Sequence, residues 1–137
     1  MAAICIAGAG DLPAILDLWK RAGTEPGHTD DIESLTKLIT RDPGALLVAV
    51  EDETIAGSVI AAWDGWRGNM YRLAVLPEAR RAGIASELVR EGERRLAERG
   101  ARRLSAVVLL DEPGAAAFWE RAGYEHRREA GRFAKVL

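Results

Sequence analysis

Residues that form disulfides or bind transition metals are scarce in this chain. Among 137 residues there is one cysteine, Cys5, and there are two histidines, His28 and His126. One cysteine cannot form an internal disulfide, and cysteine-rich or multi-histidine metal sites need more ligands than these. We therefore expect no metal site, and we expect Cys5 to face the core from a first strand.

Long hydrophobic runs and an excess of positive charge are absent as well. No stretch approaches the roughly 20 apolar residues of a membrane span, and the first ten residues lack the basic start of a signal peptide. The net charge of −2 gives no basic surface for coating nucleic acid. These absences predict a cytoplasmic location, with neither a membrane nor nucleic acid as a partner.

Apolar residues make up 48% of the sequence, which is enough for one ordinary core. No linker or repeat divides the chain, so we expect a single domain over residues 1–137. Helical and alternating patterns predict the order β-α-α-β-β-β-α-β-α-β-β. The strands are predicted at 2–7, 45–50, 55–63, 70–76, 104–110, 124–129 and 132–136, and the helices at 12–22, 32–41, 86–99 and 115–122.

Two details of this pattern predict how the elements pack. Residues 104–110 are almost continuously apolar, which is typical of a central strand that is covered on both faces. Gly92 lies on the apolar face of the predicted helix 86–99, where it costs about 1 kcal/mol against alanine. We expect Gly92 to mark close packing between this helix and the sheet.

A basic loop that contains glycine joins the predicted strand 70–76 to the helix 86–99. A helix N-terminus has unpaired N–H groups and a partial positive charge, and both favour a bound phosphate. The loop supplies two arginines, small residues that leave the backbone accessible, and a hydroxyl: Arg80, Arg81, Ala82, Gly83, Ala85 and Ser86. On these residues alone, the loop is either a phosphate pocket or an ordinary surface loop.

A second glycine pair competes for the same function. Gly8 and Gly10 stand between the first strand and the first helix, and two acids follow about 20 residues later, as in a dinucleotide fingerprint. The third glycine position is Pro13, however, and no strand precedes the two acids. The sequence therefore favours an ordinary strand-to-helix turn at residues 8–10.

Residues 71–85, YRLAVLPEARRAGIA, resemble motif A of the GNAT superfamily of N-acetyltransferases. In that motif an apolar strand ends in V-x-P and leads into R/Q-x-x-G-x-G/A, which Arg80, Gly83 and Ala85 fit. Residues 115–124, AAAFWERAGY, resemble a second signature of the superfamily, A-x-x-F-Y-x-x-x-G-F. The resemblance implies an α/β (α+β) fold: a mixed, mostly antiparallel sheet of six to seven strands with helices on both faces.

The same resemblance implies an N-acetyltransferase that uses acetyl-coenzyme A. The acetyl group would pass to a primary amine of a small molecule or peptide by direct attack in a ternary complex. The N–H groups of residues 81–86 would hold the pyrophosphate, and the strand at 73–75, in a splayed and bulged sheet, would hold the pantetheine arm. The implied coenzyme A residues are Leu73, Ala74, Val75, Arg80, Arg81, Ala82, Gly83, Ile84, Ala85, Ser86, Glu112, Phe118 and Trp119. Homodimers are usual for this resemblance, so we expect one here.

Several positions depart from the family pattern. Trp119 replaces a tyrosine that protonates the departing thiolate, Asn69 replaces a carboxylate base, and Glu112 replaces an asparagine. An indole is no useful acid and an amide takes no proton. One interpretation is catalysis by positioning, with the Leu73 N–H polarising the thioester carbonyl and protons carried by water, Tyr71, Asp64, Glu112 or an acid of the 28–31 loop. The alternative is a non-catalytic acetyl-coenzyme A sensor or a protein-interaction module.

The charges of the chain are unevenly spread. Residues 24–33 hold four acids and no lysine or arginine, whereas residues 80–103 hold eight arginines. In this fold the loop between the first two helices usually borders the acceptor, so a cationic acceptor is our hypothesis. The implied acceptor residues are His28, Asp30, Asp31, Trp63 and Asp64. Helix capping by Asp30 or Asp31, and a dimer contact through Trp63, are the alternatives.

Overall fold

The computed structural model describes residues 2–24 and 26–137, which include a five-stranded sheet. Its strands are β1 (Ala3–Ile6), β2 (Leu46–Glu51), β3 (Thr54–Trp63), β4 (Gly68–Val75) and β5 (Leu104–Ala106). They lie in sequence order across the sheet, and all neighbours are antiparallel except β4 and β5, which are parallel. This confirms the mixed, mostly antiparallel sheet that the sequence predicts.

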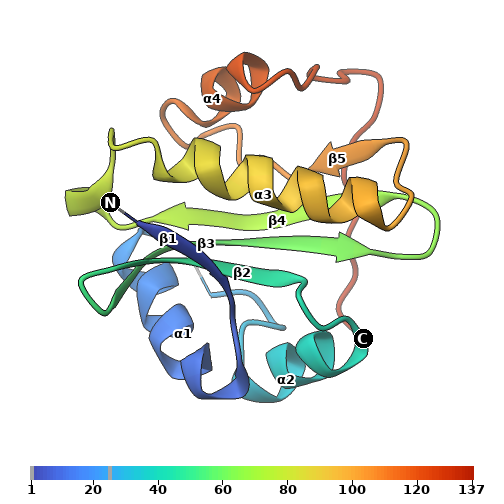
Figure 1. Cartoon of the computed structure of the whole chain (residues 1–137). Helices are drawn as coiled ribbons and strands as arrows, with labels where there is room; N and C mark the ends of the chain where they lie inside the picture. The colour runs from blue at the N-terminus through green and yellow to red at the C-terminus, as the bar shows by residue number, and fades with distance from the viewer. Residues whose placement is uncertain (1, 25) are drawn as a thin grey trace.

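Helices cover both faces of the sheet (Figure 1). They are α1 (Leu12–Arg21) and α2 (Ile32–Arg41) on one face, and α3 (Ile84–Glu98) and α4 (Ala115–Arg121) on the other. The apolar stripe of each helix faces the sheet, which produces two buried clusters, one under α1 and α2 and one under α3. No helix in the described ranges is long and apolar enough to cross a membrane.

Glycines allow α3 to lie directly on the sheet. A Cβ atom built on Gly92 would lie 2.8 Å from the Met70 Cε atom and 3.2 Å from the Ala61 Cβ atom. A Cβ atom on Gly57 of β3 would lie 3.1 Å from Ile84 Cγ2, in the first turn of α3. Both ends of the contact therefore need a residue without a side chain, which confirms the close packing predicted at Gly92.

The strand predicted at 104–110 is shorter than its apolar run, and it lies at an edge rather than the centre. Pairing of β5 with β4 stops at Ala106, opposite Met70 and just before the register of β4 against β3 shifts. Residues that continue the run are exposed, notably Leu109 and Leu110. The apolar pattern is typical of a buried strand, but a strand also needs a neighbour in register, and β5 does not follow β4 past the shift in its register.

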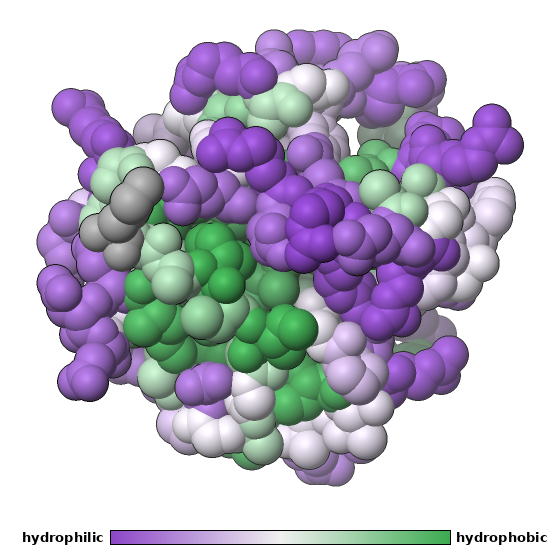
Figure 2. Space-filling view, in the orientation of Figure 1, coloured by the Kyte–Doolittle hydropathy of each residue, from purple (hydrophilic) through white to green (hydrophobic). Residues whose placement is uncertain are grey.

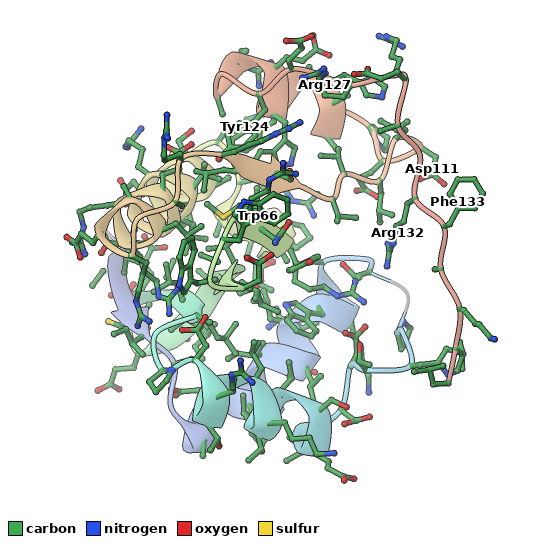
Figure 3. The ribbon with its side chains drawn as sticks, turned by 90° about the vertical axis from the view of Figure 1, so that its right-hand side faces the viewer. Trp66, Asp111, Tyr124, Arg127, Arg132 and Phe133 are labelled. Atoms are coloured by element: carbon green, nitrogen blue, oxygen red, sulfur yellow. The ribbon has the colours of Figure 1, made fainter. Side chains whose placement is uncertain are left out.

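The predicted hairpin of 124–129 and 132–136 does not form, so five strands replace the six to seven expected. Arg127 pairs with both Glu125 and Glu129, and the Ala130 N–H closes a turn on the Arg127 carbonyl. These local contacts favour a compact turn over two extended strands. The last residues run outside the body of the molecule, where the Phe133 ring is 98% exposed (Figure 3).

The first strand forms the opposite edge of the sheet. Cys5 is exposed there, so the expectation that it faces the core is wrong. Ile6 is 66% exposed, and Figure 2 shows hydrophobic side chains gathered over this edge. β1 is only four residues long and lies at the edge of the sheet, so few residues pack against either of its faces.

A buried ion pair between Arg95 and Asp42 links α3 and the end of α2 to β3. The Arg95 guanidinium of α3 pairs with Asp42, which follows α2, and donates a hydrogen bond to the Ala61 carbonyl of β3 at 2.8 Å. The second Asp42 oxygen accepts the Trp63 N–H at 3.2 Å. Both side chains are about nine-tenths buried. Because its polar atoms are satisfied from three directions, this pair fixes α2 and α3 relative to the sheet.

Removing one member of this pair should destabilise the fold. Asp42→Ala leaves the Arg95 charge buried without its partner, so we expect the free energy of unfolding to fall by about 3–5 kcal/mol in a urea titration. The double variant Asp42→Leu/Arg95→Met removes both charges and should recover much of that loss. Arg94→Met, on the exposed side of α3, should change stability by about 1 kcal/mol or less. An unchanged urea midpoint for Asp42→Ala would contradict the role given to the pair.

Candidate functional site

β4 has a bulge at its centre. Its register against β3 shifts there, and two residues of β4, Arg72 and Leu73, stand opposite the single residue Val59. Arg72 has a left-handed φ of 54°, which is rare for a residue with a side chain. Such an outlier persists only where surrounding contacts hold it, and it is often found at functional sites.

Beyond the bulge, one edge of β4 has no strand beside it in the described part of the chain. β5 pairs with β4 only from Gly68 to Met70. The Leu76 N–H donates to β3, so alternation along the strand turns the N–H groups of Leu73 and Val75 toward the opposite, open side. The bulge and the separated strands that the resemblance implies are therefore both present.

The loop between β4 and α3 presents a row of free N–H groups. Arg81 and Gly83 have left-handed φ values of 69° and 81°, and the helix begins directly afterwards. Among residues 2–24 and 26–137, no group accepts a hydrogen bond from the N–H groups of residues 81–86. Six such donors at the positive end of a helix form an anion-binding cradle.

The arginines beside this cradle have different surroundings. Arg80 donates from Nε to the Val75 carbonyl at 3.2 Å and from Nη2 to the Ala22 carbonyl at 3.3 Å. It therefore ties the end of β4 to the end of α1 while its charge stays beside the cradle. Arg81 is exposed. A Cβ atom built on Gly83 would meet nothing within 4 Å, so its positive φ alone explains the glycine.

The loop between α1 and α2 is fastened to the bulge by an ion pair. Asp30 pairs with Arg72 and also accepts the Gly27 N–H at 2.6 Å, and its side chain is only 10% exposed. The Arg72 guanidinium lies 5.3 Å from the centre of the Trp19 ring. The predicted acceptor loop thus lies beside β4, and its Asp30 charge is balanced by Arg72.

The other acidic residue of this loop caps a helix. Asp31 accepts the Ser34 N–H at 2.7 Å at the start of α2, and this hydrogen bond lowers the pKa of its carboxyl. Capping of the second helix, one of the alternatives for the two aspartates, is therefore confirmed for Asp31. His28 is exposed on the same loop.

Trp63 and Asp64 lie at the far end of the β3–β4 hairpin. Asp64 accepts the N–H groups of Arg67 and Trp66 at 2.7 and 2.8 Å, and these bonds lower the pKa of its carboxyl. Trp63 pairs with Gly68 across the hairpin. No hydrogen bond or ion pair in the described ranges links these two residues to Asp30. The structure thus attaches Asp30 to the bulge of β4 and places Trp63 and Asp64 at the turn of the β3–β4 hairpin.

Three aromatic rings pack together at α4. Trp119 is buried and meets Phe118 and Tyr124 edge to face, with ring centres 5.6 and 4.9 Å apart. The Tyr124 hydroxyl donates to Glu93 at 2.7 Å, and burial together with this carboxylate raises its pKa. Trp119 belongs to the buried hydrophobic cluster against which Leu73 of β4 also packs.

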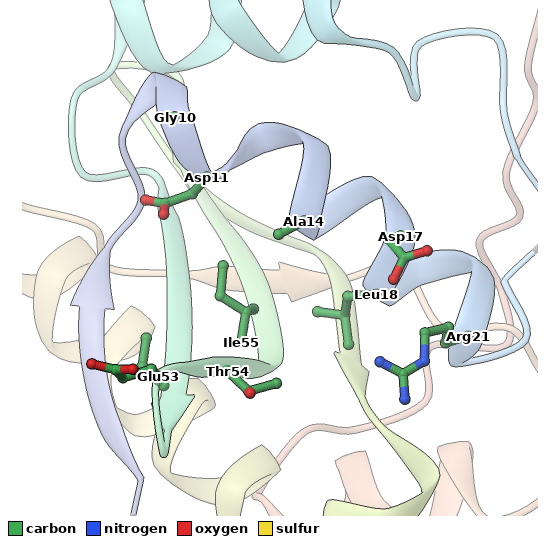
Figure 4. Close-up of a pocket in the computed structure, with 10 residues that line it drawn as sticks. Gly10, Asp11, Ala14, Asp17, Leu18, Arg21, Glu53, Thr54 and Ile55 are labelled. Carbon is green, nitrogen blue, oxygen red and sulfur yellow. The ribbon is translucent and has the colours of Figure 1, made fainter.

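The glycine turn at the first strand is not a nucleotide cradle. The Asp11 carboxylate accepts the Gly8 N–H at 2.8 Å, where a phosphate would otherwise lie, which confirms the interpretation as a strand-to-helix turn. A pocket of about 400 Å³ opens beside it, between α1 and the β2–β3 turn (Figure 4). None of the predicted site residues lines this pocket. In the described part of the chain, no cluster of three or more His, Cys, Asp or Glu side chains could hold a metal ion.

Comparison with known protein families identifies the fold. Residues 12–124 match the sequence profile of the acetyltransferase (GNAT) family. The chain belongs to this family. An acetyltransferase of Pectobacterium atrosepticum is 32% identical over 115 residues, which cover 84% of this chain and 82% of the relative. The GNAT membership predicted from the two signatures is confirmed, and with it the assignment to the N-acetyltransferases.

Solved structures share the GNAT fold over most of the chain. An aminoglycoside N-acetyltransferase in complex with coenzyme A matches with a TM-score of 0.80 at 19% identity, over 100% of this chain and 96% of that one. The PaiA N-acetyltransferase of Thermoplasma acidophilum, also in complex with coenzyme A, matches with a TM-score of 0.74 at 17% identity, over 88% of both chains. At these identities the likeness is one of fold.

Tyr71 and the three positions that depart from the GNAT pattern lie on β4, in the turn before α4 and in α4. Asn69 is part of β4 next to β5, with which it pairs through Ser105. Tyr71 is exposed on β4, and Glu112 is exposed in the turn before α4. Trp119 is directed into the core. Among these four side chains, Tyr71 and Glu112 are the two that solvent and a ligand can reach.

Sequence reasoning missed three residues that hold the centre of the site. Trp19, Ser58 and Arg72 come from α1, β3 and β4, and they are joined by hydrogen bonds and a cation–π contact. Trp19 matches an ordinary core position in a helix pattern, and Ser58 matches one in a strand pattern. The one available signal was a serine within the apolar run 55–63, because a buried hydroxyl needs partners.

A side chain at position 83 should disturb the cradle. Gly83→Ala places a Cβ atom on a left-handed residue, so we expect a loss of about 1–2 kcal/mol in the free energy of unfolding, measured by chemical denaturation. Gly10→Ala is the matched control, because a Cβ atom there also meets nothing within 4 Å and its φ is not left-handed. Equal losses in both variants would show that the conformation of Gly83 is not constrained.

Proposed function

We propose that the chain transfers an acetyl group from acetyl-coenzyme A to a primary amine by direct attack in a ternary complex. The observation that carries this proposal is the juxtaposition of the six free N–H groups at residues 81–86 with the open, bulged edge of β4. The two features lie at the two ends of one short strand-to-helix connection. A ligand that has phosphates at one end and amides along an arm fits both.

The residues present fit coenzyme A. The N–H groups of residues 81–86 are numerous enough to donate to the oxygens of the pyrophosphate, and their partial positive charge favours its negative charge. Arg80 and Arg81 supply further positive charge. Outward N–H groups at Leu73 and Val75 offer strand-like bonds to the amides of the pantetheine arm. The Gly83 position leaves open space in front of the cradle. We assign Ala74, Ala82, Ile84, Ala85 and Ser86 to this site through their backbone.

The bulge determines where the reacting group lies. When bound, acetyl-coenzyme A supplies a thioester whose carbonyl an amine can attack. The Leu73 N–H points to the open edge and donates to that carbonyl oxygen as negative charge develops there. A fixed donor of this kind is worth roughly 10²–10³ in rate. We assign Phe118 and Trp119 of α4 to the thiol end of the arm, where their packed rings would exclude water.

We assign proton transfer during the reaction to side chains that are exposed to solvent. The low pKa of Asp64 keeps that carboxylate ionised at neutral pH, so it serves as a fixed negative charge and not as an acid. Tyr71 and Glu112 are exposed, and we assign proton transfer to them together with water. Alignment of the amine and the thioester contributes several kcal/mol more without proton transfer.

For the acceptor we propose a cationic amine of a small molecule or a peptide. The loop of residues 26–31 lies beside the bulge through the Asp30–Arg72 pair, and its free acidic charge comes from Asp31. At the far end of the hairpin, Asp64 and Trp63 offer a second point for a longer acceptor. His28 is exposed on the loop. Formation of a homodimer and a cytoplasmic location stay predictions.

Coenzyme A binding should depend on the charge at position 83. We expect coenzyme A at about 100 times its Kd to stabilise the chain by roughly 2.7 kcal/mol in thermal unfolding. Gly83→Glu should abolish this shift, because a carboxylate would face the pyrophosphate. Gly83→Gln has nearly the same size and backbone strain and should keep more of it. Equal shifts for both variants would contradict binding at the cradle. Binding without thiol release for any amine would instead favour the sensor alternative.

The acceptor proposal can be tested at the loop. Asp31→Asn removes the acidic charge of the loop that lies outside the Asp30–Arg72 pair, and asparagine also caps helices, so we expect kcat/KM for a cationic amine to fall about two- to fivefold. Asp30→Asn keeps an acceptor for the Gly27 N–H but also breaks the pair with Arg72, so a larger fall in this variant reports the bulge as well as the lost charge. Asp17→Asn, on the outer side of α1, is the control. If neither loop variant lowers kcat/KM for any cationic amine, the acidic loop does not recognise the acceptor.

A further inference from the structure

A chain of buried hydrogen bonds crosses the sheet face beneath the bulge. The Trp19 indole N–H donates to the Ser58 Oγ atom at 2.9 Å, and the Ser58 hydroxyl donates to the Arg72 carbonyl at 3.0 Å. Ser58 is fully buried, and Trp19 is 3% exposed. The serine therefore uses its donor and one acceptor position inside the core, where an unpaired hydroxyl would be costly.

The carbonyl that Ser58 holds belongs to the peptide group whose N–H is that of Leu73. A peptide group is planar, and in its trans form the C=O and N–H bonds point in opposite directions. Because the Arg72 carbonyl is directed inward to Ser58, the Leu73 N–H is directed outward to the open edge. One buried hydroxyl thus sets the orientation of one exposed donor.

The bulge needs the hydrogen bond from Ser58 because regular pairing between β3 and β4 does not fix its peptide group. Val59 faces two residues of β4, so the regular ladder between β3 and β4 is interrupted at this peptide group. Arg72 is left-handed, a conformation from which a non-glycine residue tends to relax. Its side chain is held by Asp30 and by the Trp19 ring. Contacts from α1, β3 and the acceptor loop therefore converge on one residue.

We propose that Ser58, itself oriented by Trp19, is a positioning residue that aims the Leu73 N–H at the thioester carbonyl. Ser58 touches neither substrate, and it acts through the backbone of the bulge. The proposal rests on the proposed function, because it assigns the Leu73 N–H a role in acetyl transfer. It extends that function by naming the buried groups that keep the donor in place.

Two variants of nearly equal shape isolate the hydroxyl. Ser58→Thr keeps it, and Ser58→Val replaces it with a methyl group. We expect kcat for acetyl transfer to stay within about threefold of the parent in Ser58→Thr and to fall about tenfold to a hundredfold in Ser58→Val. The Kd for coenzyme A should differ between the two variants by much less than kcat does, since the phosphate cradle and the Val75 N–H are untouched. Equal kcat values in the two variants would overturn the proposal.

A readout without any ligand separates this inference from the proposed function. In ¹H–¹⁵N spectra of the free protein, the Leu73 amide signal should stay near its parent position in Ser58→Thr and move or broaden in Ser58→Val. Trp19→Phe, which replaces the indole with a smaller aromatic ring that has no N–H, should also move it, and this variant serves where Ser58→Val does not fold. A Leu73 signal unchanged in both Ser58→Val and Trp19→Phe would overturn the proposal even if the parent acetylates amines.

A general loss of stability should not mimic these effects. Leu96→Ala opens a cavity under α3, beside Gly68 and thus at the opposite end of β4 from Leu73. We expect this variant to unfold at a lower temperature while its Leu73 signal and its kcat, measured well below that temperature, match the parent. A parent that binds coenzyme A and releases no thiol would refute the proposed function, and the amide signals would still decide the role of Ser58.

Discussion

The bulge in β4 is the constraint on which the candidate site depends. A regular strand would pair along its whole length on both sides, and it would leave no backbone for a ligand. Here β4 stays in the sheet through β3, separates from β5 after Met70, and shifts its register at Arg72. The groups that lose their sheet partners are the same groups that can pair with an extended ligand. The site is thus built from the backbone, with few side chains needed for chemistry.

Close packing joins this edge to the anion cradle. Gly57 and Gly92 let α3 lie directly on β3 and β4, and Ile84 in its first turn is buried against them. The N-terminus of the helix therefore has little freedom to move relative to the bulge. At the other end of α3, the Arg95–Asp42 pair fixes the helix in position. A ligand that spans both features would meet them at a fixed separation, which reduces the ordering cost of binding.

Features that depend on neighbours in sequence could be predicted, and features that depend on distant partners could not. The cap at Asp31 and the turn at residues 8–10 have local causes, and Gly92 is marked by its place on the apolar face of a helix, so the sequence indicates all three. The shortened β5 and the missing last hairpin depend on whether a neighbouring strand continues in register, which an apolar pattern does not report. The Ser58–Arg72 and Asp30–Arg72 contacts join residues 14 and 42 positions apart. They follow from a register shift that no single strand pattern reveals.

The exposed position of Cys5 has a practical consequence. It is the only cysteine, and it lies on β1 at the edge of the sheet opposite to β5. A maleimide dye would therefore attach at one known point, remote in the strand order from the open edge of β4. The Cys5 thiol will also react with the disulfide reagents that detect the thiol of free coenzyme A by a colour change. Each chain therefore adds a constant background to such an assay. Cys5→Ser removes that background from an exposed position.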